Sequence, residues 1–256
     1  MKRILTTLSK KWPEYLLEIL VLIIGIYGGF ALEEWGDNLN KREQEQVILR
    51  QLVEDFEANK KQLNEKIEMR ETIIASGITL LKEFDNKGAI ESDSLFTCLA
   101  IITLDPTFDP VNSDLVGSGN IHLIQNKRLT KLLSKWTSDI VAVKEIENVW
   151  QTMSYESFAP FLIKAGLTRA LVNSFWKDTH PTWGLDKNKE VKGIYLNESK
   201  QDNIKDISRF TEIDGYASMA ISLNNAANEQ STTLMERIDE ILELLKSEIR
   251  TTQPTE

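Results

Sequence analysis

The chain has 256 residues, of which 41% are hydrophobic and 27% are charged, as expected for a folded protein with one sizeable core or two small ones. Acidic residues outnumber basic ones by 39 to 30, which gives a net charge of −9. This balance argues against a nucleic-acid-binding protein, because phosphates require an excess of cations. The single cysteine excludes an intramolecular disulfide framework and a paired-cysteine metal or redox site. Few glycines and prolines favour an all-α fold with long helices.

The most specific signal is an apolar segment near the N-terminus. Residues 15–32 read YLLEILVLIIGIYGGFAL, with Glu18 as the only charged residue. A membrane span needs about 20 mostly apolar residues, and the flanks add three aromatic side chains typical of membrane interfaces: Trp12, Tyr15 and Trp35. Because the outer two are separated by about 35 Å of helix, residues 15–35 are predicted to form a transmembrane signal-anchor helix. A buried helix of a soluble protein is the alternative.

The charges on either side of this segment predict its orientation. Residues 1–14 carry four basic side chains before the span, whereas Glu33, Glu34 and Asp37 follow it directly. The positive-inside rule then places residues 1–14 in the cytoplasm and residues 36–250 outside, in the periplasm if the membrane is a bacterial inner membrane. No small-residue cleavage site follows the apolar run, so a single-pass anchor is favoured over a cleaved signal peptide.

Two features inside the predicted span have possible functions. Gly25 and Gly29 form a GxxxG pattern with Gly28 beside it, which would let a second helix approach closely and form a homo-oligomer. Glu18 is an acidic residue in an apolar segment, and such residues often contact a partner or an ion path. Its position about one turn from Pro13 favours hydration near the cytoplasmic headgroups over an ion-coupling role.

The remaining sequence reads as helices joined by loops. Apolar residues recur at helical spacing over most of it, and the predicted helices cover 38–86, 92–103, 126–164 (with a kink or break at Pro160) and 202–249. The first of these is expected to continue the transmembrane helix and to pack in an elongated antiparallel bundle. Residues 174–200 are predicted to be a partly ordered connection and residues 251–256 a disordered tail. The Asp-Pro steps at 105–106 and 109–110 predict extended or turn conformations.

No catalytic or metal-binding pattern stands out, so the sequence predicts no enzyme activity and no cofactor. His122, between two apolar residues, is expected to be packed, and His180 is expected to lie in a solvated loop. Residues 116–120 (VGSGN) superficially suggest a phosphate-binding turn, but they lack the lysine and the spacing of the known phosphate loops. A simple backbone turn is the better interpretation.

Two stretches resemble a known family. The first comprises Glu18-Ile19, Gly25-Ile26, Ala31-Leu32 and Trp35, followed by a charged helix, and the second comprises Phe108-x-Pro110 and Ser118-Gly119-Asn120 before Leu123-Ile124 and Leu129. Together they are similar to an uncharacterised single-pass membrane-protein family that is widespread in Bacteroidota. The resemblance covers about residues 14–135. The resemblance implies a bacterial membrane protein with a helical domain. The family has no established activity that could be transferred to this chain.

We therefore expect a single-span inner-membrane protein whose periplasmic helical domain associates with itself or binds another membrane or periplasmic protein. A ligand-sensing or transport-accessory domain is the alternative, with residues 105–124 as the binding element and Phe108, Pro110, Ser118, Gly119 and Asn120 as its candidate residues. A third possibility is an ion-coupled or pore-forming assembly that uses Glu18. The lipid bilayer is the expected partner in all three cases.

Overall fold

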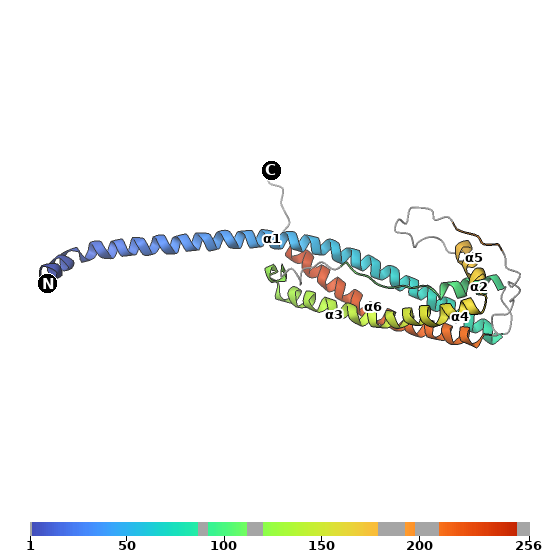
Figure 1. Cartoon of the computed structure of the whole chain (residues 1–256). Helices are drawn as coiled ribbons and strands as arrows, with labels where there is room; N and C mark the ends of the chain where they lie inside the picture. The colour runs from blue at the N-terminus through green and yellow to red at the C-terminus, as the bar shows by residue number, and fades with distance from the viewer. Residues whose placement is uncertain (1, 87–91, 112–119, 179–192, 198–209, 250–256) are drawn as a thin grey trace.

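The computed structural model describes residues 2–86, 92–111, 120–178, 193–197 and 210–249. Every regular element in these ranges is helical, as the sequence predicts. The elements are α1 (Lys2–Asn86), α2 (Ser92–Ile101), the 3₁₀ turn η1 (Asn120–Leu123), α3 (Lys127–Met153), the π-helical turn η2 (Ser154–Phe158), α4 (Ala159–Lys164), α5 (Thr168–Asp178) and α6 (Thr211–Glu248). Figure 1 shows them as an elongated bundle from which one end of α1 projects as a long rod.

Helix α1 is continuous over 85 residues, which is about 130 Å at 1.5 Å per residue. The predicted continuation of the apolar segment into the charged helix is therefore confirmed, with no break at Gly36. Residues 37–44 are exposed, and the bundle begins at Glu45, whose side chain is buried. About 12 Å of bare helix thus separates the apolar segment from the bundle.

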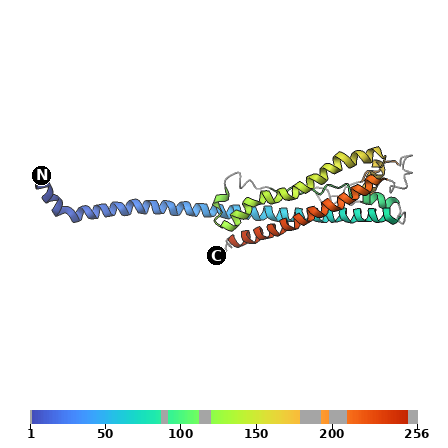
Figure 2. The same ribbon diagram turned by 90° about the horizontal axis from the view of Figure 1, so that it is seen from below.

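Three long helices, α1, α3 and α6, form the body of the bundle (Figures 1 and 2). Helix α6 runs antiparallel to α1, because Glu57 pairs with Lys246 whereas Gly77 lies against Ile221. Helix α3 runs parallel to α1, because Phe56 contacts Trp136 whereas Arg70 contacts Glu147 further along both helices. The predicted helical bundle is confirmed, with one parallel pair that the sequence did not indicate.

The parallel pair requires the chain to return along the bundle between α2 and α3. Residues 104–111 form the first part of this return without regular secondary structure, which fits the two Asp-Pro steps. The side-chain amide of Asn59 donates to the carbonyl of Val111 (3.1 Å) and accepts from its amide (2.7 Å). Gln125 then donates its amide to Glu45 at the start of the bundle. Side chains of α1 thereby satisfy backbone groups that have no neighbouring strand.

Two hydrophobic cores follow one another along the bundle. The proximal core, nearer the apolar end of α1, is formed by α1, α3, α6 and the return segment, with Leu49, Leu63, Leu129 and Ile238 among its fully buried residues. The distal core adds the shorter helices, and its buried residues include Ile73, Leu99, Trp150, Phe158, Leu167 and Ala217. Cys98 is partly buried against this distal core.

The helix that begins as α3 runs through η2 into α4, and the π-helical turn η2 accommodates Pro160 directly after it. A proline has no N–H and its ring clashes with the carbonyl four residues earlier; here the chain widens into η2, where the amide of Ala159 donates to the carbonyl of Ser154. After α4, Gly166 adopts a left-handed φ of 72°. The backbone amide of Leu167 donates to the carbonyl of Leu162, and that of Gly166 donates to the carbonyl of Ile163. These two bonds form a Schellman cap, after which the chain turns into α5. The helix predicted over 126–164 is thus present, and its irregularity near Pro160 is a π-helical turn rather than a break.

Other sequence predictions need correction. Residues 174–178, predicted as part of a connection, belong to α5. The described part of the last helix, α6, begins at Thr211, and its predicted start near residue 202 lies outside the described residues. His122 is exposed on η1 rather than packed, because the short 3₁₀ turn directs its side chain away from the bundle. His180 and the predicted tail at 251–256 lie outside the described residues.

Candidate functional site

The first candidate site is the apolar end of α1. All side chains of residues 16–35 are exposed and none packs on the bundle. This is the part of the helix that is long and apolar enough to cross a membrane, with a mean hydropathy of 2.0 over its best window and 0% of that window buried. An apolar surface of this extent is unusual on a soluble monomer. Length and composition thus make α1 a candidate membrane-spanning helix.

The side chains and glycines predicted to have a function in this segment all lie on its exposed surface where the structure describes them. A Cβ atom added at Gly25, Gly28 or Gly29 would meet nothing within 4 Å, so these positions are open to another helix. Trp12 and Trp35 are exposed near its two ends, and Glu18 is exposed close to the first of them. The side chain of Tyr15 lies outside the described part. The proposed roles of all these residues stay predictions.

The predicted binding loop is divided by the structure. Phe108 is fully buried in the proximal core and Pro110 is also buried, so both hold the return segment against the helices. Asn120 is exposed at the start of η1, and Ser118 and Gly119 lie outside the described residues. The burial of Phe108 and Pro110 fits a structural role for these two residues. A ligand-binding role for the loop stays a prediction.

A polar layer separates the two cores, and it consists of Arg70, Glu147, Asn228 and Ser231. The guanidinium of Arg70 is 0% exposed and is paired with the Glu147 carboxylate. It also donates to Ser231 Oγ (2.8 Å), to Asn228 Oδ1 (3.3 Å) and to the Pro106 carbonyl (3.2 Å). Glu147 in turn accepts the amide of Phe108. The layer thus joins α1, α3, α6 and the return segment.

The electrostatics of this layer are those of a buried ion pair. Burial raises the pKa of Glu147, and the charge of Arg70 and the Phe108 amide oppose this shift. Burial lowers the pKa of Arg70, and Glu147 opposes that shift. The Glu147 carboxylate and the terminal nitrogens of Arg70 are paired with each other and with neighbouring polar groups, which offsets part of the cost of burying two charges. Arg70 Nε is buried without a hydrogen-bonding partner. The contacts that the pair makes lie within the protein, so it is a structural element.

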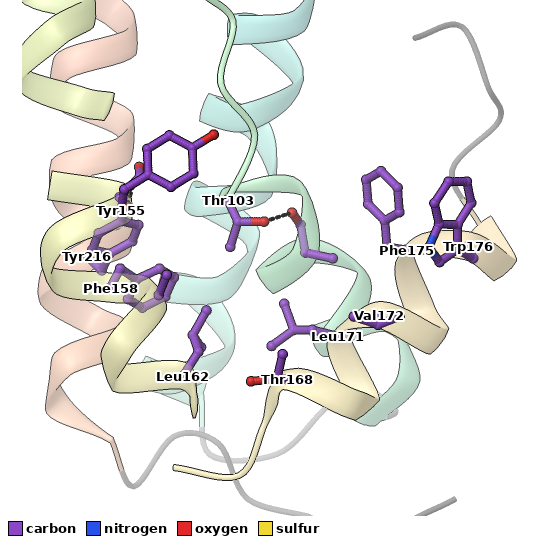
Figure 3. A pocket seen from close by; sticks show the side chains of 13 residues that line it. Thr103, Tyr155, Phe158, Leu162, Thr168, Leu171, Val172, Phe175, Trp176 and Tyr216 are labelled. Carbon is purple, nitrogen blue, oxygen red and sulfur yellow. Dashed lines mark hydrogen bonds between the residues drawn. The ribbon is translucent and has the colours of Figure 1, made fainter. Parts of the chain in front are cut away.

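The second candidate site is a cavity of about 290 Å³ in the distal core. Its wall includes the buried side chains of Phe158, Leu162, Leu171 and Tyr216, which come from η2, α4, α5 and α6. Figure 3 shows Tyr155, Phe158 and Tyr216 facing Leu171, Val172 and Phe175 across it. The π-helical turn and the α4–α5 turn create this space, because they hold α5 away from α6. Both π-helical turns and cavities of this size are frequent at ligand-binding sites.

A few polar atoms lie in the wall of this mostly apolar cavity. The Tyr216 hydroxyl donates to Ser154 Oγ, and Thr103 Oγ1 donates to the Ala100 carbonyl (2.6 Å). Burial raises the pKa of Tyr216 far above its ordinary value, so this hydroxyl is neutral at physiological pH. The site offers hydroxyl groups without a charge, and it contains no base or nucleophile activated for catalysis.

Sequence reasoning missed this cavity. The available signals were Pro160, which follows the π-helical turn, and Gly166, which allows the reversal into α5. The aromatic residues at 155, 158, 161, 175 and 176 also concentrate in this part of the chain. Their convergence on one space depends on the direction in which α5 folds back, which periodicity does not reveal.

Comparison with known proteins adds no relative. No family model, no curated protein and no solved structure matches this chain. Among the residues that the structure describes, no group of three or more metal-binding side chains occurs. The apolar end of α1 and the distal cavity are therefore the two features that indicate a function.

Proposed function

We propose that this chain is a single-span bacterial inner-membrane protein that holds a helical interaction domain in the periplasm. The observation that carries the proposal is the exposed, unbroken apolar stretch of α1, which continues without a hinge into the bundle. Burial of this stretch in lipid would remove the largest exposed apolar surface of the described structure from water. The basic residues before it and the acidic residues after it support a cytoplasmic N-terminus.

The domain is expected to act by binding a partner protein or a second copy of itself. The open face at Gly25 and Gly29 supports self-association within the membrane. The soluble part carries the acidic excess of the chain, so it is expected to stand away from anionic lipid headgroups. A ligand-sensing or transport-accessory role is the second candidate function, and the distal cavity favours it.

Two measurements on the full chain in its native host test the anchor and its orientation. Alkaline extraction should leave the protein in the membrane pellet; release into the supernatant would contradict a spanning helix. For orientation, Glu229→Cys places a thiol on an exposed α6 position in a Cys98→Ala background. A membrane-impermeant maleimide should label it in spheroplasts with an intact inner membrane. Labelling only after that membrane is broken would overturn the orientation.

A matched control and an oligomer test complete the design. Thr7→Cys, in the same background, should be protected until the inner membrane is opened. The mass of the complex in mild detergent should exceed that of one chain, and Gly25→Leu should reduce it if the glycine face mediates self-association. Glu18→Gln tests the third possibility, because an ion-coupled activity would be lost with the carboxylate whereas a hydrated interfacial glutamate would tolerate the change.

A further inference from the structure

We propose that the distal cavity is a binding site for a small, uncharged, flat apolar molecule that carries one hydrogen-bonding group. The residues that line it come from the end of α2 and from η2, α4, α5 and α6, and the cavity lies at the end of the bundle remote from the apolar segment (Figures 1 and 3). Nothing in this inference depends on the orientation of the protein in a membrane.

The charge of the ligand follows from the wall of the cavity. None of the lining side chains is acidic, basic or a histidine, and the Tyr216 phenol stays protonated because it is buried. A charged ligand would lose its hydration without gaining a counterion, which is strongly unfavourable. The wall therefore selects a neutral molecule.

The size and shape follow from the volume and the aromatic rings. An apolar cavity of about 150 Å³ accommodates benzene, and this one is about 290 Å³, which corresponds to two fused rings. The rings of Phe158 and Tyr216 stack on each other, with an angle of 9° between their planes. Because stacked rings cover one face of each other, the pair is a rigid aromatic block in the wall of the cavity. A planar molecule can pack against the outer face or the edges of this block.

The hydroxyl groups supply the hydrogen-bonding point. Because Ser154 Oγ accepts a hydrogen bond from the Tyr216 hydroxyl, the Ser154 hydroxyl can donate its own hydrogen to an acceptor on the ligand. Thr103 Oγ1, which donates to a backbone carbonyl, keeps lone pairs for a ligand donor. Tyr155 and Thr168, which also line the cavity, are exposed, so the cavity reaches the surface of the protein. One ligand hydroxyl or carbonyl can therefore be satisfied beside an otherwise apolar ring system.

The test is a titration of 2-naphthol, a neutral two-ring molecule with one hydroxyl, against the full chain in lipid nanodiscs. Nanodiscs avoid competition from detergent, and empty nanodiscs give the background. We expect saturable binding detected by the fluorescence anisotropy of the probe. The anionic analogue 2-naphthoate should bind at least tenfold more weakly. Absence of saturable 2-naphthol binding above the background, or equal binding of the anion, would overturn the proposal.

Variants locate the bound probe. Val172→Trp fills the cavity from α5 and should weaken 2-naphthol binding at least tenfold. The matched control Val141→Trp changes an exposed valine of α3 outside the cavity and should bind like the unmodified chain. Tyr216→Phe should weaken binding severalfold through its effect on Ser154. If Val172→Trp loses helical circular dichroism, Ala100→Leu fills the cavity from α2 instead. Unchanged binding in a folded cavity-filling variant would contradict the proposed location.

Discussion

The proximal and distal halves of the bundle differ in how their cores are built. The proximal core is packed from three long helices around mainly aliphatic side chains, and Phe56 and Trp136 form its aromatic contact. The distal core is assembled from α1, α2, α3, η2, α4, α5 and α6, and aromatic contacts link Trp150, Phe158, Phe161 and Tyr216 within it. The Arg70–Glu147 layer lies between the two. Regular packing fills space, whereas short helices joined by special turns leave a cavity.

This difference suggests a division of labour. The proximal half has the features of a rigid spacer, because long continuous helices share a dry core along their length. The distal half contains the π-helical turn, the left-handed glycine and the cavity, which are local departures from ideal packing. Such departures cost stability and are concentrated at functional sites. Binding is therefore expected at the distal half and support at the proximal half.

The largest effect is expected from the layer that divides the halves. Arg70→Ala leaves the buried Glu147 carboxylate without its counterion, and it should lower the free energy of unfolding by about 3–5 kcal/mol, measured by urea denaturation of the full chain in mild detergent. Arg237→Ala, which removes a partly exposed pair with Asp139, should cost less than about 1 kcal/mol. The double variant Arg70→Met/Glu147→Met should recover much of the loss. Equal costs for the two arginines would contradict a buried structural pair.

A second comparison uses the same substitution in each core. Leu63→Ala, at a 0% exposed site of the proximal core, should lower the free energy of unfolding by about 2–5 kcal/mol. Leu171→Ala, in the wall of the cavity, should cost less, because that side chain already lacks neighbours on one side. Urea midpoints of both variants provide the measurement. A larger loss at Leu171 would mean that the distal half is as tightly packed as the proximal one.

A smaller effect is expected at the turn that positions α5. Gly166→Ala forces a left-handed φ on a residue with a Cβ, and it should destabilise the protein by about 1–2 kcal/mol. Gly215→Ala is the matched control, because it lies in α6 with nothing within 4 Å of an added Cβ, and it should stabilise by about 0.5–1 kcal/mol. Changes of the same sign in thermal unfolding would refute the conformational argument.

The smallest effect on stability concerns Cys98, which reports on the distal core. Burial raises the pKa of this thiol, and a hydrogen bond with Ser76 only partly opposes the shift. Because the thiolate is the reactive form, maleimide labelling should be much slower in the folded chain than in urea. Since the folded pKa is above the unfolded one, stability should decline as the pH rises past the ordinary thiol value. Rapid labelling of the folded chain at neutral pH would show that this core opens readily.

The sequence predicted those features that local patterns encode. The apolar stripe and the absence of a proline between Pro13 and Pro106 indicate an unbroken α1, and Asn126 caps α3 where the pattern begins. The parallel course of α1 and α3 was not predictable, because helical periodicity gives the buried face and not the direction. Arg70 was also missed, since a single arginine beside an apolar stripe is usually solvated. The cavity was missed as well, because it forms only when the chain turns at Gly166 and α5 folds back beside η2 and α4. Neither Gly166 nor Pro160 alone reveals that arrangement.

The hinge-free course of α1 has a mechanical consequence. About 42 residues separate the end of the apolar segment at Trp35 from the contact of Gly77 with α6, a lever of about 63 Å. If this helix inclines by about 20°, the average tilt of membrane helices, the far end of the bundle moves sideways by about 20 Å. A rotation of the helix about its own axis sweeps the cavity around the membrane normal in the same way. Bilayer thickness and contacts between spans would thus set where this cavity points.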